Sequence, residues 1–402
     1  MTVRMVPLRD VCRQDRVTVR PGEHPSLRYL GLESIEAGSG SLVEGELSKT
    51  PEAPQANSFL FGPQHVLYGK LRPYLNKVFV PNFEGKCSTE IIPLLTTEEL
   101  DPRYLAYFLR TPSTVHQIAA KTAGARMPRA DMDFVFGLEI WIPPLTEQRR
   151  IVDILSRAEG IVRLRREAQA KAQAIIPALF IEMFGDPATN PKGWPVHPLG
   201  DLLRSGPSNG LYKHKSAYGR GTPILRIDAF YDGKIRDLAM LKRVELSGED
   251  EVARFCLKAG DIVINRVNSP EYLGKSTIIP ELSEPTVFES NMMRLSVDRD
   301  AVLPDFLIAM LQQPAARRHF LSRAKHAINQ SSINQQDVKT LPTLVPPLLD
   351  QAQFKERVEA LAAIIHQQAE AFNKASAAFA SLLARSFAYS PPGPAMPGQI
   401  PI

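Results

Sequence analysis

Two stretches of the chain carry apolar residues at alternating steps of three and four, the pattern of a helix that packs against one partner helix. The first stretch covers residues 143–186 and the second covers residues 346–388, and each begins with a Pro-Pro pair. Each is therefore predicted to form one long helix. At about 1.5 Å per residue, roughly 38 helical residues in the first would extend about 57 Å, with a kink expected at Pro177.

The apolar seams give the expected contact residues of a coiled coil. They are Ile151, Leu155, Val162, Ile176 and Leu179 in the first stretch, and Phe354, Val358, Leu361, Ile365, Phe372, Phe379 and Leu382 in the second. Because each stripe is narrow, it favours a single partner, and the other long helix is the obvious one. An antiparallel pair is expected; the alternative is two unrelated bundle helices.

The segments before the two helices share one order of short motifs. In residues 1–142 and again in 187–345, short β-like runs precede a helix, expected near 102–121 in the first segment and near 303–325 in the second. HPLGDLL resembles VPLRDVC, and GDIVINRVN stands in the place of QHVLYGKLRP. The pattern predicts an α+β fold with a pseudo-two-fold tandem repeat of domain, helix, domain and helix, followed by a disordered Pro/Gly tail over 389–402.

Composition narrows the class of protein. The chain has 402 residues, 44% hydrophobic and 23% charged, with a net charge of +5 that suits an anionic partner. Its three cysteines lie far apart, which argues against a disulfide scaffold or a thiolate zinc site. Neither an amino-terminal apolar segment nor an apolar run approaching 18 residues occurs. A cytoplasmic protein with no membrane partner is therefore expected.

Enzyme motifs are incomplete wherever they begin. Gly274-Lys275-Ser276 has the end of a phosphate-binding loop, but Ser269 stands where the first glycine is needed. Glu84-Gly85-Lys86 has half of a nuclease signature, but no aspartate lies between Asp15 and Asp101. The Asn-Pro-Pro-aromatic motif of an amino-methyltransferase does not occur, and the histidines lack metal-ligand spacing. Neither a catalytic residue nor a bound metal is expected.

Polar and basic residues gather in matching loops of the two segments. Arginine and lysine contact guanine edges and phosphates, and asparagine and glutamine contact adenine, so these loops indicate nucleic-acid binding; the alternative is a solvated loop surface. The candidates in the first segment are Lys70, Arg72, Tyr74, Asn76, Lys77, Arg126 and Arg129. In the second they are Lys213, Lys215, Arg220, Asn265, Arg266, Asn268, Asn329, Gln330, Ser331, Ser332, Asn334 and Gln335.

The sequence resembles the specificity subunit of type I restriction–modification systems over nearly its whole length. The motifs that carry the resemblance are PPLTEQRRIVDIL at 143–155, the weaker PPLLDQAQFKERV at 346–358, LFIEMFGDP at 179–187, GWPVHPLGDLL at 193–203 and GPSNGLYKHKSAYGRGTPILRI at 206–227. The second copy departs from the first, with Asp350 in place of Glu147 and with Ala352 and Gln353 in place of Arg149 and Arg150.

The resemblance implies that 1–142 and 187–345 are target recognition domains, each reading half of a split double-stranded DNA site, with the helices setting the spacer. It also implies partners: methyltransferase (modification) subunits, expected in two copies, and restriction or motor subunits. S-adenosylmethionine, Mg²⁺ and ATP would then act only through these partners. Two other functions remain open, a stand-alone DNA nuclease and a coiled-coil protein adaptor.

Overall fold

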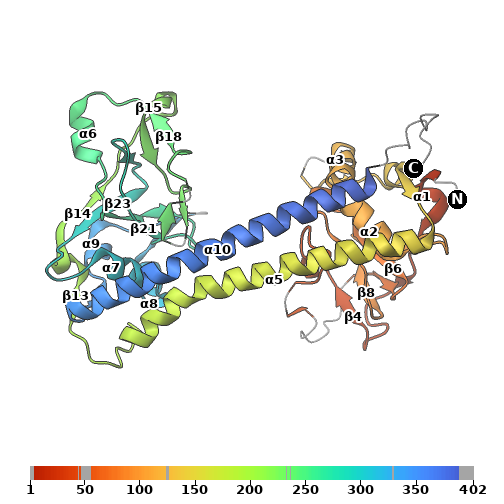
Figure 1. Ribbon diagram of the computed structural model, residues 1–402, viewed down its shortest axis with the longest axis horizontal. Coiled ribbons are helices and arrows are strands. Elements are labelled where there is room, and N and C mark those ends of the chain that lie inside the picture. The colour runs from red at the N-terminus through yellow and green to blue at the C-terminus, as the bar shows by residue number, and fades with distance from the viewer. Residues whose placement is uncertain are drawn as a thin grey trace, which may run out of the picture. The chain divides into compact units, whose positions relative to one another are not determined.

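The computed structural model describes residues 4–43, 45–46, 56–123, 126–231, 233–235, 237–327 and 330–388. The tail expected over 389–402 lies outside the described residues. The chain divides into two compact units, one made of Met1–Glu167 with Glu370–Ile402 and the other of Ala168–Ala369. Each unit holds one mixed α/β domain together with part of both long helices, α5 (Leu145–Phe184) and α10 (Leu348–Phe387) (Figure 1).

The domain of the first unit contains two four-stranded sheets, ordered β2-β9-β6-β7 and β3-β5-β8-β4, and a pair β1-β12 that precedes the long helix. Its elements are β1 (Arg4–Pro7), α1 (Leu8–Val11), β2 (Cys12–Gln14), β3 (Thr18–Val19), β4 (Arg28–Leu30), η1 (Leu32–Ser34), β5 (Ser58–Phe61), β6 (His65–Gly69), η3 (Pro73–Leu75), β7 (Val78–Phe79), β8 (Gly85–Ser88), β9 (Ile91–Thr96), α2 (Pro102–Arg110), α3 (Pro112–Ala120), β10 (Thr122–Ala123), β11 (Arg129–Ala130), α4 (Met132–Gly137) and β12 (Glu139–Ile142).

The domain of the second unit repeats this plan. The sheet β14-β23-β19-β21 matches β2-β9-β6-β7 strand for strand, and β13-β26 matches β1-β12. Its elements are β13 (Val196–Pro198), η4 (Leu199–Leu202), β14 (Leu203–Asn209), η5 (Lys215–Ala217), β15 (Tyr218–Leu225), β16 (Phe230–Tyr231), β17 (Lys234–Ile235), β18 (Lys242–Val244), α6 (Glu249–Phe255), β19 (Ile262–Asn265), β20 (Val267–Asn268), β21 (Ser276–Ile278), β22 (Val287–Phe288), β23 (Met292–Val297), α7 (Pro304–Leu311), α8 (Pro314–Arg323), β24 (Lys325–Ala327), β25 (Gln330–Ser332), α9 (Gln335–Lys339) and β26 (Pro342–Leu344).

The helix expected in each domain is divided in two by a proline. In the first domain α2 ends at Arg110 and α3 begins at Pro112, and in the second α7 ends at Leu311 and α8 begins at Pro314. Proline fits the first turn of a helix but cannot supply the N–H that a continuing helix needs. Residue Thr111 accordingly caps α3, its side chain accepting a hydrogen bond from the Thr114 N–H.

In the first unit the beginning of α5 packs beside the end of α10, so the two helices run antiparallel there. Ile151 and Leu155 of α5 share a core with Leu383 of α10. The ring of Phe387, the last residue of α10, lies 4.8 Å from the ring of Tyr104 in α2. Both helices therefore contribute to the core of the first domain.

In the second unit four phenylalanines join the helices to the domain. Phe180 and Phe184 of α5 pack against Phe354 of α10 and against Phe306 of α7, with ring centroids between 4.8 and 5.8 Å apart, and none of the four is exposed. The expected seam at Ile176 and Leu179 is only partly buried, packed at the edge of this cluster. Sequence periodicity therefore missed the two side chains that α5 buries most completely here.

Most of the other side chains predicted to lie in the coiled-coil seam of α5 and α10 are only partly buried. Ile151, Leu155 and Phe354 are buried. Half-buried are Val162, Val358, Leu361, Ile365, Phe372 and Phe379. Leu382 was assigned wrongly, because it is 38% exposed whereas Leu383 is 4% exposed. The seam takes a step of four after Phe379, which keeps the buried side chain on the face towards α5. The chain of α5 also continues as one helix through Pro177, whose side chain is exposed.

A buried glutamine joins each domain to the start of its long helix. The side chain of Gln148 accepts a hydrogen bond from the Asp101 N–H (2.9 Å) and donates to the carbonyls of Glu99 (2.7 Å) and Pro143 (2.9 Å). Gln351 makes the same three contacts in the second unit, with the Leu303 N–H (2.8 Å) and the carbonyls of Ala301 (3.3 Å) and Pro346 (2.8 Å). Both glutamines are 0% exposed. The two domains are thus attached to their helices by equivalent joints.

Candidate nucleic-acid interface

The loop between β6 and β7 of the first domain has a fixed backbone that carries two exposed candidates. Arg72 and Asn76 adopt left-handed conformations, with φ of 52° and 51°, on either side of η3. The Arg72 N–H donates to the Pro128 carbonyl (2.7 Å), and the Lys70 N–H donates to the Glu90 carbonyl (2.9 Å). Non-glycine residues adopt this conformation rarely, and such strain clusters at functional sites. The loop holds Arg72 and Tyr74, which is 54% exposed, at its outer surface.

The second domain repeats this framework at the loop between β19 and β21. The Arg266 N–H donates to the Asn291 carbonyl, as Lys70 does to Glu90, and the Ile333 N–H donates to the Arg266 carbonyl, both at 2.9 Å. The left-handed position of Asn76 is taken by Gly274, whose φ is 76°. The two domains therefore share these backbone hydrogen bonds but present different side chains, Arg72 from a left-handed residue and Asn268 from strand β20.

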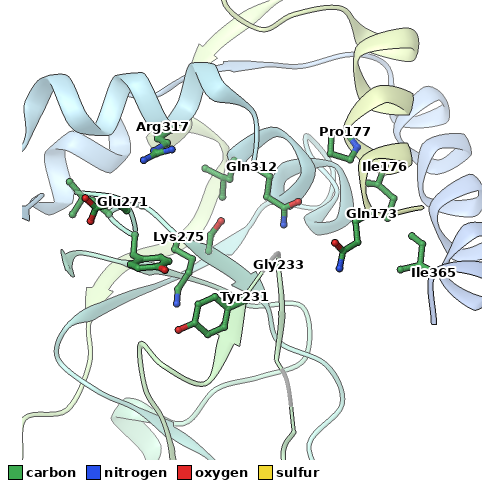
Figure 2. Close-up of a pocket in the computed structure, with 15 residues that line it drawn as sticks. Gln173, Ile176, Pro177, Tyr231, Gly233, Glu271, Lys275, Gln312, Arg317 and Ile365 are labelled. Carbon is green, nitrogen blue, oxygen red and sulfur yellow. The ribbon is translucent and has the colours of Figure 1, made fainter. Parts of the chain in front are cut away.

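A lysine at the end of each loop has a structural role. Lys77 donates its Nζ to the Leu32 carbonyl (2.5 Å), and Lys275 donates to the Ile227 carbonyl (2.6 Å). Figure 2 shows Lys275 beside Tyr231, and its Nζ lies 3.9 Å from the centre of that ring. Lys77 was predicted to bind DNA, but in the structure its ammonium group holds the loop against η1.

Three further candidates in the first domain make contacts within the protein. Arg129 forms an ion pair with Glu90 (2.8 Å), and the Lys70 Nζ lies 3.9 Å from the same carboxylate. Hydrogen bonds from Arg129 lower the pKa of Glu90 below its ordinary value. Asn76 donates its side-chain amide to the Arg110 carbonyl (3.3 Å). Arg126 is exposed, so the outward-facing cations of this surface are Arg72, Arg126 and the partly neutralised Arg129.

Several candidates of the second domain face inward. Asn265 is 0% exposed, and Ser331, which is 2% exposed, contacts the His326 Nδ1 through its Oγ (2.9 Å). The prediction that these two side chains contact DNA is therefore wrong for this conformation. Strand β19 continues the buried run of Ile262–Ile264 through Asn265. Asn334, by contrast, is exposed and caps α9, with its side chain accepting from the Gln336 and Asp337 N–H groups.

The other candidates of this domain remain at or near the surface. Asn268 accepts a hydrogen bond from the Ser269 N–H (2.8 Å), and Arg266 donates to the Ser290 carbonyl (3.2 Å). Gln330 and Gln335 are exposed, and Ser332 is half-buried. Asn329 lies outside the described residues. The surface around Asn268 and Gln330 is thus more amide-rich than its counterpart around Arg72.

A basic groove of about 900 Å³ lies elsewhere on the second domain, over β15 and β18. Its lining includes the predicted Lys213 and Lys215 together with three residues that sequence reasoning missed, Arg226, Lys242 and Arg243. Antiparallel pairing of β15 with β18 brings these scattered cations together, which no local pattern reveals. Lys213 pairs with Glu251 (2.8 Å), and the exposed Arg220 pairs with Glu245.

A second pocket of about 530 Å³ lies where the loop 271–276 approaches the long helices (Figure 2). Its polar lining includes Gln173 of α5, Gln312 at the end of α7, Glu271, Lys275 and Arg317. Mixed charge and open access make it a surface depression rather than an enclosed catalytic cavity.

Catalytic alternatives find little support in the described residues. Lys86 of the Glu84-Gly85-Lys86 triplet is 2% exposed and donates its Nζ to the Glu23 carbonyl (2.9 Å), so it cannot serve a bound metal or phosphate as it stands. Across the part of the chain that the structure describes, no three His, Cys, Asp or Glu side chains gather as a potential metal site. None of the described helices has the length and apolarity required to cross a bilayer.

Comparison with known proteins finds similarity to one family of DNA-specificity proteins. Residues 52–173 match the type I restriction modification DNA specificity domain. A Methanocaldococcus jannaschii protein named for the MjaX type I restriction enzyme specificity subunit is 34% identical over 188 residues, 46% of this chain and 44% of that protein. The StySPI type I restriction enzyme specificity subunit of Salmonella potsdam is 27% identical over 305 residues, 72% of this chain and 65% of that protein. Over these parts of its length the chain is similar to type I restriction specificity subunits.

Structural similarity extends over nearly the whole chain. A chain from a solved type I restriction–modification system, described for its complex assembly and conformational transition, matches with a TM-score of 0.57 at 21% identity and covers 96% of this chain and 97% of that one. At that identity the match supports the fold alone. The sequence matches cover about half to two thirds of the length of the two relatives.

Proposed function

We propose that this chain is a specificity subunit that recognises double-stranded DNA at a bipartite site, with one half-site read by each domain. The observation that carries the proposal is the repeated loop framework, in which one hydrogen-bonded backbone presents Arg72 and Tyr74 in the first domain and Asn268 in the second. Arginine suits guanine edges and asparagine suits adenine edges. Two similar frames with different side chains would therefore read two different sequences.

Methylation and cleavage of the DNA would be carried out by partner subunits. Modification subunits, expected in two copies, would methylate adenine after flipping it from the duplex, and restriction subunits would cleave. S-adenosylmethionine, Mg²⁺ and ATP would be used by these partners and not by this chain, whose described residues offer loops and helices for binding. Such a complex would act in the cytoplasm, where it meets the chromosome.

Co-expression tests the function directly. The chain is produced with a cognate methyltransferase subunit in a host without other adenine methylation, and genomic DNA is read by single-molecule sequencing. Methylation confined to one bipartite sequence is the expected result. Methylation at no site by an assembled, active complex would contradict the proposal, and cutting of plasmid DNA by the purified chain with Mg²⁺ alone would favour the nuclease alternative.

A further inference from the structure

A buried polar network connects α5 to the first domain. Arg110, the last residue of α2, is 5% exposed and forms an ion pair with Glu159 of α5. Tyr107 donates its hydroxyl to the same carboxylate (3.0 Å), and its ring lies 5.3 Å below the Arg110 guanidinium. Burial and the Glu159 carboxylate together raise the pKa of Tyr107 to about 12, which keeps the phenol a hydrogen-bond donor.

The network continues from Arg110 to the loop that carries Arg72. The Asn76 side-chain amide donates to the Arg110 carbonyl (3.3 Å), and Arg110 Nη2 donates to the Gly38 carbonyl (3.1 Å). The Gly38 N–H donates in turn to the Asn76 carbonyl (3.0 Å). Asn76 ends the η3 turn in a left-handed conformation. These successive contacts therefore link the carboxylate of Glu159 to the loop between β6 and β7.

The second domain lacks this network although its elements are equivalent. Alignment of α7 with α2 places Gln312 at the position of Arg110 and Ala309 at that of Tyr107, and alignment of the helix starts at Gln148 and Gln351 places Ala362 at the position of Glu159. Gln312 is exposed and borders the 530 Å³ pocket, where Figure 2 shows its side chain near Gly233.

The cost of burying an unpaired charge explains why both Arg110 and Glu159 are needed to hold this geometry. A buried guanidinium without a carboxylate partner strongly destabilises the fold, whereas an ion pair contributes little net stability compared with an apolar contact. The pair is therefore better suited to fixing one geometry than to raising stability. Glycine at position 40 belongs to the same arrangement, because a Cβ there would lie 2.3 Å from Arg110 Nη1.

We propose that Glu159 is a positioning residue for DNA reading by the first domain, acting through Arg110 and Asn76 to hold the Arg72 loop. This inference rests on the proposed function. It adds an asymmetry between the two half-sites: reading of the first depends on a contact from the long helix, and reading of the second does not.

The test compares Glu159→Ala and Arg110→Gln in the full chain, the second variant taking the residue found at the equivalent position of the second domain. Glu167→Ala, which removes an exposed carboxylate from the same helix, is the matched control. Amide hydrogen exchange at Gly38, Leu75 and Asn76 is expected to rise at least about tenfold in both variants, because each breaks the buried link. Exchange in the loop 266–275 should stay unchanged.

A second readout is the sequence preference of the assembled methyltransferase complex. Both variants are expected to lose about tenfold in discrimination at the first half-site alone, and the double variant should lose no more than either single one, since all break one network. Glu159→Gln retains an acceptor for Tyr107 and should recover part of the loss.

Three results would overturn the inference: unchanged exchange at these amides, equal loosening of both loops, or faster exchange with unaltered first half-site preference. The exchange measurement needs neither DNA nor partner. A wild-type complex that methylates nothing would therefore count against the proposed function, while exchange would still decide whether Glu159 positions the loop.

Discussion

Arg72 combines three properties of a reading residue: a left-handed backbone, an exposed side chain and a loop hydrogen-bonded on both sides. The fixed backbone reduces the entropy that is lost when the guanidinium binds a base or phosphate. Tyr74 lies exposed beside it in the same loop, with an aromatic face available for contact. A lysine at position 72 would keep the charge but not the planar fork of donors.

Replacing Arg72 by alanine should weaken binding to one half-site only. The expected loss is about 1–3 kcal/mol if the guanidinium makes a bidentate contact with a guanine. The measurement is titration of the assembled complex with duplexes in which each half-site is altered in turn. Arg72→Lys serves as the charge-preserving control, and a uniform loss for both half-sites would show that Arg72 is not a base reader.

For Asn265 we expect a change in stability and no change in DNA recognition. Its side chain is fully buried, and neither its Oδ1 nor its Nδ2 has a partner among the described residues. Because an unpaired buried amide costs about 1–3 kcal/mol, Asn265→Val should raise the free energy of unfolding by an amount of that order. Denaturant titration checks the stability, and methylation sequencing should show an unaltered site. A loss of second half-site preference would restore Asn265 to the interface.

These two residues show where sequence reasoning succeeds and fails at this scale. The loops around Arg72 and Asn268 could be located, because polar residues there follow a buried strand in both copies. Residue type could not separate the exposed Arg72 from the internally bonded Lys77 or the buried Asn265. That separation depends on strand register and on contacts with residues far along the chain, such as Leu32.

At the scale of elements, periodicity predicted the long helices and the positions of the shorter ones, but not the division of each shorter helix in two. The expected ranges 143–186 and 346–388 contain α5 and α10, which begin directly after the Pro-Pro pairs. Proline separated α2 from α3 and α7 from α8, where apolar periodicity alone suggested one helix. Phe180 and Phe184 were missed because their buried face is set by the domain beside α5 as well as by α10.

Gln148 and Gln351, which join each domain to its long helix, should both contribute to the stability of the fold. Gln148→Ala and Gln351→Ala each leave one buried N–H and two carbonyls without a partner, so each should lower the free energy of unfolding by at least about 2 kcal/mol. Gln353→Ala, an exposed glutamine on α10, is the control and should change stability by less than about 0.5 kcal/mol. Thermal denaturation measures all three. Similar stability of Gln148→Ala and the control would mean that water replaces the lost contacts.

At the scale of the molecule, the repeat supports the proposal that each domain reads one half-site and the helices set the spacer. The domains differ in their charged and amide-bearing loops while sharing sheet order, strand pairing at the helix entry and lysine contacts. The repeat was visible in the sequence because motif order is preserved. Of the basic groove over β15 and β18, only Lys213 and Lys215 were predicted from the sequence, since the other cations come from separate strands.

A matched insertion tests this division. Adding one heptad to α5 after Glu167 and one to α10 after Ala369 keeps both apolar seams in phase and adds about 10.5 Å of helix. The spacer of the methylated site should lengthen by about three base pairs, with both half-sites unchanged, as read by genomic methylation sequencing. Altered half-site sequences with an unaltered spacer would contradict the proposed role of the helices.

The chemistry of the two glutamine joints has a consequence for how such proteins diversify. Each glutamine binds only main-chain amide and carbonyl groups of the domain that it holds. Main-chain groups are the same whatever side chains the domain carries. The glutamine contacts would therefore form with any domain of the same fold, whereas contacts between side chains, such as Phe184 with Phe306 and Glu159 with Arg110, would have to be matched anew.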